Sequence, residues 1–523
     1  MYHCLSYLEQ LYGAALVRAF HTIPAQVTEL DLRDNELGNK TGAELAEAFR
    51  AIPDSVTVLY LGENDLGNKT GAELAEAFRA IPDSVTVLYL GGNGLGNKTG
   101  AELAEAFRAI PISVTMLDLT GNNLGNKTGA ELAEAFRAIP ISVTMLDLRD
   151  NELGNKTGAE LAEAFHAIPA QVTMLDLRWN DLGNKTGAEL AKAFRAIPNS
   201  VTMLYLGQNN LGNKKTGAEL AEAFRTIPAQ VTELDLSGNG LGNKTGAELA
   251  EAFRAIPISV TMLDLTGNDL GNKTGAELAE AFHAIPAQVT TLYLRQNNLG
   301  NKKTGAELVE AFRAIPAQVT ELDLGWNGLG NKTGAELVQI FAAIPAQVTE
   351  LNLWNNGFGN KTGAELAEAF RVIPDSVNVL NLSGNALNRM TVESIQQLRL
   401  PSSVRRVYLD LHEIQAMTVA QRHALRAAIP ESTKIFLTDN VGSKLPSVKS
   451  DYEVERLFNK GLVSLKTQAA FFIHNMLKNA KRSRQDGETV EDRDEILPAK
   501  RSKPEDALEG KLPESLRAYV CGF

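Results

Sequence analysis

The chain has 523 residues, of which 44% are hydrophobic, enough for several ordinary domains or for one long array of repeats. Its formal net charge of −12 disfavours general binding of nucleic acid or of anionic membranes, and no apolar run approaches the ~18 residues that span a bilayer, so we expect no nucleic-acid partner and no transmembrane segment. The two cysteines, Cys4 and Cys521, stand at opposite ends, which favours a reducing compartment over a disulfide framework, and with no His or Cys pair at ligand spacing we expect neither a metal nor a cofactor.

Residues 1–24 are predicted to form an N-terminal half-repeat and cap. They lack the basic segment of a secretory signal peptide and contain Glu9, which favours a cytoplasmic protein. The segment YGAALVRAFHTIP (12–24) matches the helical half of the repeat that follows. We therefore expect the helix of a first unit whose strand is missing.

Twelve to thirteen copies of a 29-residue unit fill residues 25–388, with one extra lysine, Lys215 or Lys303, in two copies. One asparagine marks each copy, and because a buried amide must have hydrogen-bond partners, we expect these anchor asparagines to bond the backbone of adjoining coils. The anchor asparagines, which we assign a structural role, are Asn35, Asn64, Asn93, Asn122, Asn151, Asn180, Asn209, Asn239, Asn268, Asn297, Asn327, Asn356 and Asn385.

The first half of each unit has the period of a strand. In VTELDLRDNELGNKTGAELAEAFRAIP (27–53), Leu30 and Leu32 point to one face, while Glu29, Asp31 and Arg33 point to the other. The predicted strand is therefore apolar towards the helices and variable towards the opposite side.

The second half of the unit has helical period. Apolar residues from Leu45 to Ile52 recur at i, i+3, i+4 and i+7 and form one stripe. Thr41 and Glu44 have the spacing of a capping box at the start of this helix, and Pro53 closes it. Since no copy can bury its stripe alone, we expect the copies to stack.

Stacked strands lie about 4.8 Å apart, whereas stacked helices need about 8–10 Å, so the array must curve with its strands inside. We predict an α/β fold: a right-handed curved solenoid with a parallel sheet on the concave face, helices on the convex face and a helical C-terminal extension. The pattern LxLxxNxLGxxxGAELAEAF resembles the leucine-rich repeat of the ribonuclease-inhibitor-like subclass, over residues 12–440. That resemblance implies a horseshoe that works in protein–protein recognition.

The near-identity of the copies and the C-terminal tail also resemble the leucine-rich repeat effectors of intracellular bacterial pathogens. This resemblance implies a secreted virulence protein that acts in the cytoplasm of a host cell.

The copies differ mainly in and just after the strand. At the position of Glu29, six consecutive copies carry an apolar residue, and such a stripe on an exposed sheet face marks an interaction site. Methionine adapts to irregular partners; the alternative is that neighbouring long side chains shield the stripe. The six residues are Val58, Val87, Met116, Met145, Met174 and Met203.

The position of Asp31 holds seven aspartates and four tyrosines, which favours a protein partner with a basic surface; the alternative is that these charges are simply solvated. All three tryptophans of the chain lie in the variable positions, and tryptophan is enriched at interface hot spots. The candidate partner-binding residues are Tyr60, Tyr89, Asp118, Asp147, Asp176, Tyr205 and Tyr293, with Arg149, Arg178, Arg295, Trp179, Trp326 and Trp354.

Drift after recent duplication is the alternative explanation of these differences. Drift would also change exposed helix positions such as Glu47 and Arg50, and these change rarely from copy to copy.

We find no catalytic constellation. The recurring LGNKTG lacks the spacing of a phosphate-binding loop and is interpreted as a structural turn. The chain is therefore predicted to be a non-enzymatic scaffold. The alternatives are a regulator of a small GTPase, acting through one of the arginines near the strand ends, and a purely structural spacer.

Residues 389–440 are predicted to hold degenerate repeats, with strands at Val407–Leu411 and Lys434–Asn440. Residues 441–484 are predicted to form a helical cap, and residues 485–523 a charged, disordered tail. The basic groups Lys481–Arg484 and Lys500–Lys503 resemble a bipartite nuclear-import signal; a solvated charge run is the alternative. The sequence leaves the oligomeric state open.

Overall fold

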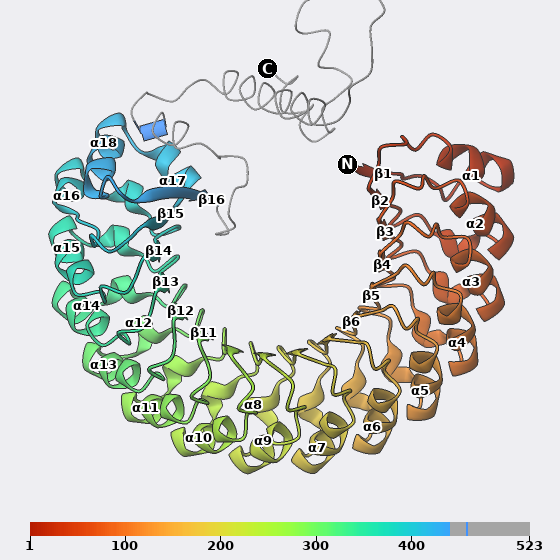
Figure 1. Cartoon of the computed structure of the whole chain (residues 1–523), viewed down its shortest axis with the longest axis horizontal. Coiled ribbons are helices and arrows are strands. Elements are labelled where there is room, and N and C mark those ends of the chain that lie inside the picture. The colour runs from red at the N-terminus through yellow and green to blue at the C-terminus, as the bar shows by residue number, and fades with distance from the viewer. Residues whose placement is uncertain (440–456, 459–523) are drawn as a thin grey trace, which may run out of the picture. The chain divides into compact units, whose positions relative to one another are not determined.

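The computed structural model describes residues 1–439 and 457–458. In this part of the chain, sixteen parallel strands form one sheet in which each strand pairs with the next in sequence order. The strands line the concave side of the repeat array and the helices cover its convex side (Figure 1). The predicted fold class, an α/β solenoid, is confirmed.

The strands are short and evenly spaced along the chain. Their bounds are β1 (Tyr2–Cys4), β2 (Glu29–Asp31), β3 (Val58–Tyr60), β4 (Val87–Tyr89), β5 (Met116–Asp118), β6 (Met145–Asp147), β7 (Met174–Asp176), β8 (Met203–Tyr205), β9 (Glu233–Asp235), β10 (Met262–Asp264), β11 (Thr291–Tyr293), β12 (Glu321–Asp323), β13 (Glu350–Asn352), β14 (Val379–Asn381), β15 (Arg406–Asp410) and β16 (Lys434–Thr438).

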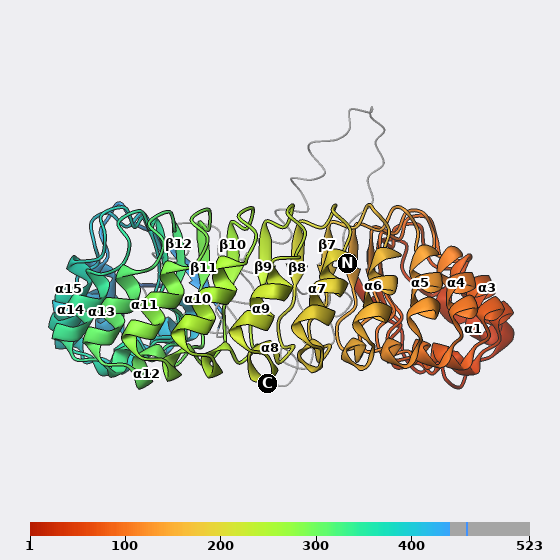
Figure 2. The same cartoon turned by 90° about the horizontal axis from the view of Figure 1, so that it is seen from below.

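The helices of successive coils stand side by side in one layer, as the view onto the convex side shows (Figure 2). Their bounds are α1 (Gly13–Phe20), α2 (Gly42–Phe49), α3 (Gly71–Phe78), α4 (Gly100–Arg108), α5 (Gly129–Arg137), α6 (Gly158–His166), α7 (Gly187–Arg195), α8 (Leu211–Lys214), α9 (Gly217–Phe224), α10 (Gly246–Arg254), α11 (Gly275–His283), α12 (Leu299–Lys302), α13 (Gly305–Arg313), α14 (Gly334–Phe341), α15 (Gly363–Arg371), α16 (Val392–Gln397), α17 (Leu411–Ala416) and α18 (Val419–Ala428).

Each long helix starts where the sequence predicts. In the first full coil, the Thr41 hydroxyl accepts a bond from the Glu44 N–H at 3.2 Å, and the Glu44 carboxylate accepts one from the Thr41 N–H at 2.9 Å. The same capping box recurs in the other 29- and 30-residue coils up to α15. A capping threonine stabilises a helix by roughly 1 kcal/mol.

The core lies between the sheet and the helix layer. Leu30 and Leu32 of the first full coil are fully buried, and they meet Leu45 and Phe49 of its helix in one continuous apolar cluster. The predicted alternation of the strand and the predicted stripe of the helix are therefore both confirmed.

The anchor asparagines connect neighbouring coils. The Asn180 amide group donates to the carbonyl oxygens of Leu148, Leu177 and Arg178 at 2.9 to 3.1 Å. Its oxygen accepts from the N–H groups of Asn151 and Leu153 in the preceding coil at 3.1 and 3.2 Å. Repeated in copy after copy, this pattern confirms the prediction that the anchors are buried and bonded to adjoining backbone.

The LGNKTG turn also has a structural role. The Lys69 ammonium donates to the Lys40 carbonyl oxygen at 2.6 Å, and the Lys98 ammonium donates to the Lys69 carbonyl oxygen at 2.8 Å. The turn itself is a short 3₁₀ helix, η1 (Leu37–Asn39) in the first full coil. In the two coils with an extra lysine, it lengthens to one α-helical turn, α8 or α12.

The first coil corrects one prediction. The expected absence of a strand before α1 is wrong, because Tyr2–Cys4 forms β1 and pairs in parallel with β2. The sequence YHC lacks the Leu-x-Leu alternation, so its pairing depends on the edge that β2 offers. The Asn35 oxygen accepts from the Leu8 N–H at 3.0 Å, which extends the anchor pattern into this coil.

In the segment predicted to hold degenerate repeats, β15 lies one residue earlier than the expected strand, and β16 spans Lys434–Thr438. Here Glu413 replaces the anchor asparagine, and its carboxylate accepts from the N–H groups of Ala386 and Leu387. The predicted helical cap (441–484) and charged tail (485–523) lie outside the described residues, apart from Leu457 and Phe458, and stay predictions.

Candidate partner-binding face

A continuous row of apolar side chains crosses the concave face. Each member is the register partner of the next across β3–β8. All six are partly exposed, so neighbouring side chains shield them in part but do not cover them. We call this set the apolar row: Val58, Val87, Met116, Met145, Met174 and Met203.

The central row, at the position of Asp31, runs beside the apolar row. Its tyrosines are partly exposed, and Tyr60 and Tyr89 stack at 4.5 Å between ring centroids. The expected exposure of the aspartates in this row is corrected, because Asp118, Asp147 and Asp176 are buried.

A local hydrogen bond explains the burial of these aspartates. The Asp147 carboxylate accepts from the N–H of Arg149, two residues on, at 3.0 Å, and Asp176 accepts from the N–H of Arg178 at 3.0 Å. A short acidic side chain that bonds its own backbone in this way stabilises a turn. The turn after the strand therefore favours aspartate whether or not a partner is present.

Arginines two residues after the central position neutralise several of these carboxylates. Arg149 contacts Asp147 at 2.6 Å and Asp176 at 3.5 Å, while Arg178 contacts Asp176 at 2.5 Å. Arg178 also lies 5.3 Å from the centroid of the Tyr205 ring. In β6 and β7 the acidic row is thus paired within the chain.

The three tryptophans differ in exposure. Trp179 and Trp326 are 57% and 45% exposed, respectively. Trp354 is 8% exposed, packed against Trp326 at 5.7 Å and under the Arg295 guanidinium at 4.9 Å. Trp354 therefore offers a partner little surface of its own and instead packs against the exposed Trp326.

The position of Asp34, which holds Trp179 and Trp326, has positive φ in every full repeat from Asp34 to Gly384. Glycine, asparagine and aspartate adopt this left-handed backbone most readily, which explains much of the variation there without a partner. The exceptions are Glu63, Gln208 and Gln296 together with Trp179 and Trp326, the two bulkiest, at φ +58° and +56°; a left-handed backbone costs such residues roughly 1–2 kcal/mol. The recurring Gly, Asp and Asn on both sides of the anchor asparagine was the sequence signal for this backbone.

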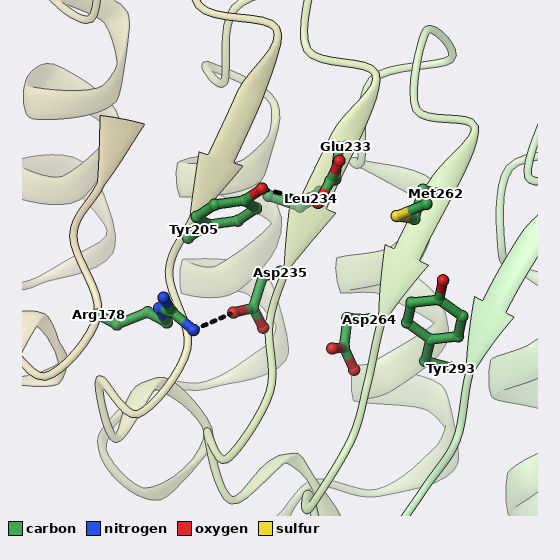
Figure 3. Close-up of a pocket in the computed structure, with 8 residues that line it drawn as sticks. All are labelled: Arg178, Tyr205, Glu233, Leu234, Asp235, Met262, Asp264 and Tyr293. Atoms are coloured by element: carbon green, nitrogen blue, oxygen red, sulfur yellow. Dashed lines mark hydrogen bonds and ion pairs between the residues drawn. The ribbon is translucent and has the colours of Figure 1, made fainter. Parts of the chain in front are cut away.

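A hollow of about 280 Å³ opens in the central row between β7 and β11 (Figure 3). Its lining includes three carboxylates that sequence analysis did not select, Glu233, Asp235 and Asp264, together with Met262. The residues that line it are Arg178, Tyr205, Glu233, Leu234, Asp235, Met262, Asp264 and Tyr293.

Burial dominates the electrostatics of this hollow. It raises the pKa of the Asp264 carboxyl and, together with the bond to Glu233, the pKa of the Tyr205 hydroxyl. One strand further on, burial raises the pKa of Asp323 to about 6, above its usual value of 3.8, although the Gly325 N–H donates to it. Buried carboxylates of this kind gain most from an added positive charge.

Comparison with known proteins assigns the family. A family model described as a leucine-rich repeat matches residues 231–250 and 319–337. The crystal structure of LegL7, a leucine-rich repeat-containing protein from Legionella pneumophila, is 41% identical, with a TM-score of 0.51 over 58% of this chain and 95% of LegL7. The chain belongs to the leucine-rich repeat family.

A solved structure of lower similarity also matches this leucine-rich repeat protein. A chain of the yeast Rad7–Elc1 complex is 15% identical, with a TM-score of 0.35 over 65% of this chain and 89% of that chain. A search of curated proteins finds no match.

Over the part of the chain that the structure describes, no helix combines the length and the apolar character needed to cross a membrane.

Proposed function

We propose that this leucine-rich repeat chain is a protein-interaction scaffold whose concave face binds a protein partner. The observation that carries the proposal is the apolar row, which stays partly exposed without a gap across β3–β8. Trp179, in the turn after β7, adds a large exposed side chain five residues after Met174 of this row. Apolar stripes and tryptophans of this kind supply most of the binding energy in protein interfaces.

The strain at Trp179 further supports a role in binding rather than in spacing alone. A pure spacer would gain stability from glycine or asparagine at this left-handed position, as other coils have. A costly and exposed side chain is expected where it contacts something else.

The alternative of a small-GTPase regulator is less well supported. An arginine that stabilises a transferring phosphate must be free to reach it. Arg33, Arg149 and Arg178 each contact an aspartate of the same strand end, at 2.7, 2.6 and 2.5 Å. Arg295 lies 3.7 Å from Asp323 and over Trp354.

We further propose that the chain is a bacterial effector that acts in the host cytoplasm. The 41% identity to a Legionella pneumophila protein supports this proposal. A reporter enzyme that depends on a host cofactor, fused to the N-terminus, tests it in infected cells. Reporter activity that requires an intact secretion system is expected, and activity equal to that of a secretion-deficient strain would contradict an effector role.

Site-specific photo-crosslinking tests the binding face. A photoreactive phenylalanine analogue replaces Met174 on the concave face or, as a matched control, the exposed Arg195 at the end of α7. We expect a discrete crosslinked protein from the Met174 position and none from the Arg195 position. The Trp179→Ala substitution should weaken the crosslink while the circular dichroism spectrum is unchanged. Crosslinking confined to the Arg195 position would place the interface on the convex side and refute the proposal.

A further inference from the structure

The hollow in the central row arises from the order of four residues. Across β8–β11 this row reads Tyr205, Asp235, Asp264 and Tyr293, so two small acidic side chains lie between two rings. Since neighbouring strands are about 4.8 Å apart, the two tyrosines start about 14 Å apart. Where tyrosines occupy adjacent strands, as in β3 and β4, they stack and leave no such space.

The carboxylates in the hollow lack the arginine that accompanies others in the same row. In Asp-Leu-Arg copies, the arginine two residues on turns back and binds the aspartate, as Arg149 binds Asp147. In β9 and β10 that position is Ser237 or Thr266, whose N–H groups donate to the aspartates at 2.7 Å but bring no charge.

The charges around the hollow are therefore unbalanced. The guanidinium of Arg178, which lines the hollow, binds Asp176 at 2.5 Å and lies farther from Asp235, at 4.0 Å. Asp264 forms no ion pair among the residues that the structure describes, and the Thr266 N–H donates to it at 2.7 Å. Glu233 accepts a bond from the Tyr205 hydroxyl at 2.9 Å, which also holds that ring at the edge of the hollow (Figure 3).

We propose that this hollow binds an arginine side chain of the protein partner, seated between Tyr205 and Tyr293 with its guanidinium on Asp235 and Asp264. The inference rests on the proposed concave-face binding and names the chemistry that one part of that face recognises. The partner's arginine would take the place beside the aspartates that Arg149 and Arg178 of this chain take beside Asp147 and Asp176.

The chain's own contacts favour arginine as the occupant. Arg178 already combines a carboxylate contact with a position over the Tyr205 ring, and a planar guanidinium suits both contacts better than an ammonium group. A volume of about 280 Å³ accommodates one long side chain.

The test uses the methionine methyl groups of the full chain, labelled with carbon-13 and observed by NMR. Met262 lines the hollow and reports on it, while Met116, in β5, serves as the internal control. The probe is N-acetyl-arginine methylamide, and the matched neutral probe is its citrulline analogue. We expect a saturable shift of the Met262 signal with the arginine probe alone, and no shift of Met116.

Two pairs of substitutions, one that fills the hollow and one that removes its charge, complete the design. Ser237→Arg with Thr266→Arg recreates the Asp-Leu-Arg sequence of other coils and should occupy the hollow from within; Asp235→Asn with Asp264→Asn should remove its charge. Each pair is expected to weaken arginine binding about tenfold or more. Thr120→Arg, the same change outside the hollow, should leave binding unchanged.

An equal response to the citrulline analogue, or full binding by the Ser237→Arg/Thr266→Arg variant, would overturn the inference. Because this assay needs no partner, its failure leaves the crosslinking result at Met174 untouched, and the two proposals fail separately.

Discussion

Removing one anchor asparagine from the middle of the array should break the connection between two coils. Asn180 is fully buried, and Asn180→Ala deletes an amide that donates three bonds and accepts two. The two accepted bonds matter most, because they satisfy the N–H groups of Asn151 and Leu153 in the preceding coil. The alanine side chain cannot replace them, and both donors remain buried.

A buried polar group left without a partner costs roughly 1–3 kcal/mol, so two orphaned N–H groups predict a loss of about 2–6 kcal/mol. In a repeat array each coil contacts only its neighbours, so this loss weakens one interface and the array can unfold in two parts. Asn180→Asp should cost at least as much. It keeps an oxygen for the two N–H groups but turns an acidic oxygen towards three carbonyl groups.

Urea unfolding followed by circular dichroism measures the loss, and hydrogen exchange locates it. The matched control is Asn184→Ala, an exposed asparagine of the same coil. We expect a lower urea midpoint for Asn180→Ala, a second transition, and faster exchange confined to the coils around β6 and β7. A midpoint equal to that of Asn184→Ala would show that the anchor bonds contribute little and would refute this reasoning.

Three further changes test other parts of the structure. Burial raises the pKa of Glu413 to about 7, above the ~4.3 of an exposed glutamate. The contribution of this group to stability is therefore full below about pH 4.3 and is lost as the pH rises through 7. Glu413→Gln should flatten this dependence in urea midpoints measured from pH 5 to 8. Trp179→Asn should raise the free energy of unfolding by about 1 kcal/mol by relieving a left-handed tryptophan, and an unchanged or lower value in urea unfolding would contradict the assigned strain. Gly158→Ala should lower the melting temperature, because its new Cβ would lie 2.5 Å from the Glu189 Cβ and overpacking costs roughly 1–3 kcal/mol; Ala159→Ser, at an exposed position, should not.

The candidate site was only partly predictable from the sequence. The apolar row could be predicted because period-2 alternation assigns a face to each strand residue, and the register then aligns equal positions of successive copies. The exposure of an individual side chain on the concave face was not predictable in this way. Trp354 and Trp326 both follow a strand closely, yet only Trp326 is substantially exposed.

Backbone conformation explains another part of what sequence comparison misread. The variation at the position of Asp34 suggested a surface that changes to suit a partner, whereas positive φ at that position restricts the choice of residue. The aspartates of the central row are similarly favoured by a bond to their own backbone. In both cases a local structural requirement mimics a pattern of recognition.

The sequence by itself determined the repeat, its two periods, the capping boxes and the anchor asparagines, because each depends on residues close together in the chain and recurs in copy after copy. Only the tertiary structure decided which concave side chains remain exposed and where the hollow lies. Tyr205 and Tyr293 are 88 residues apart in the sequence and share one row because the coils between them stack in register. The space between them depends on which side chains the neighbouring coils place beside it, and this is a property of the assembled sheet.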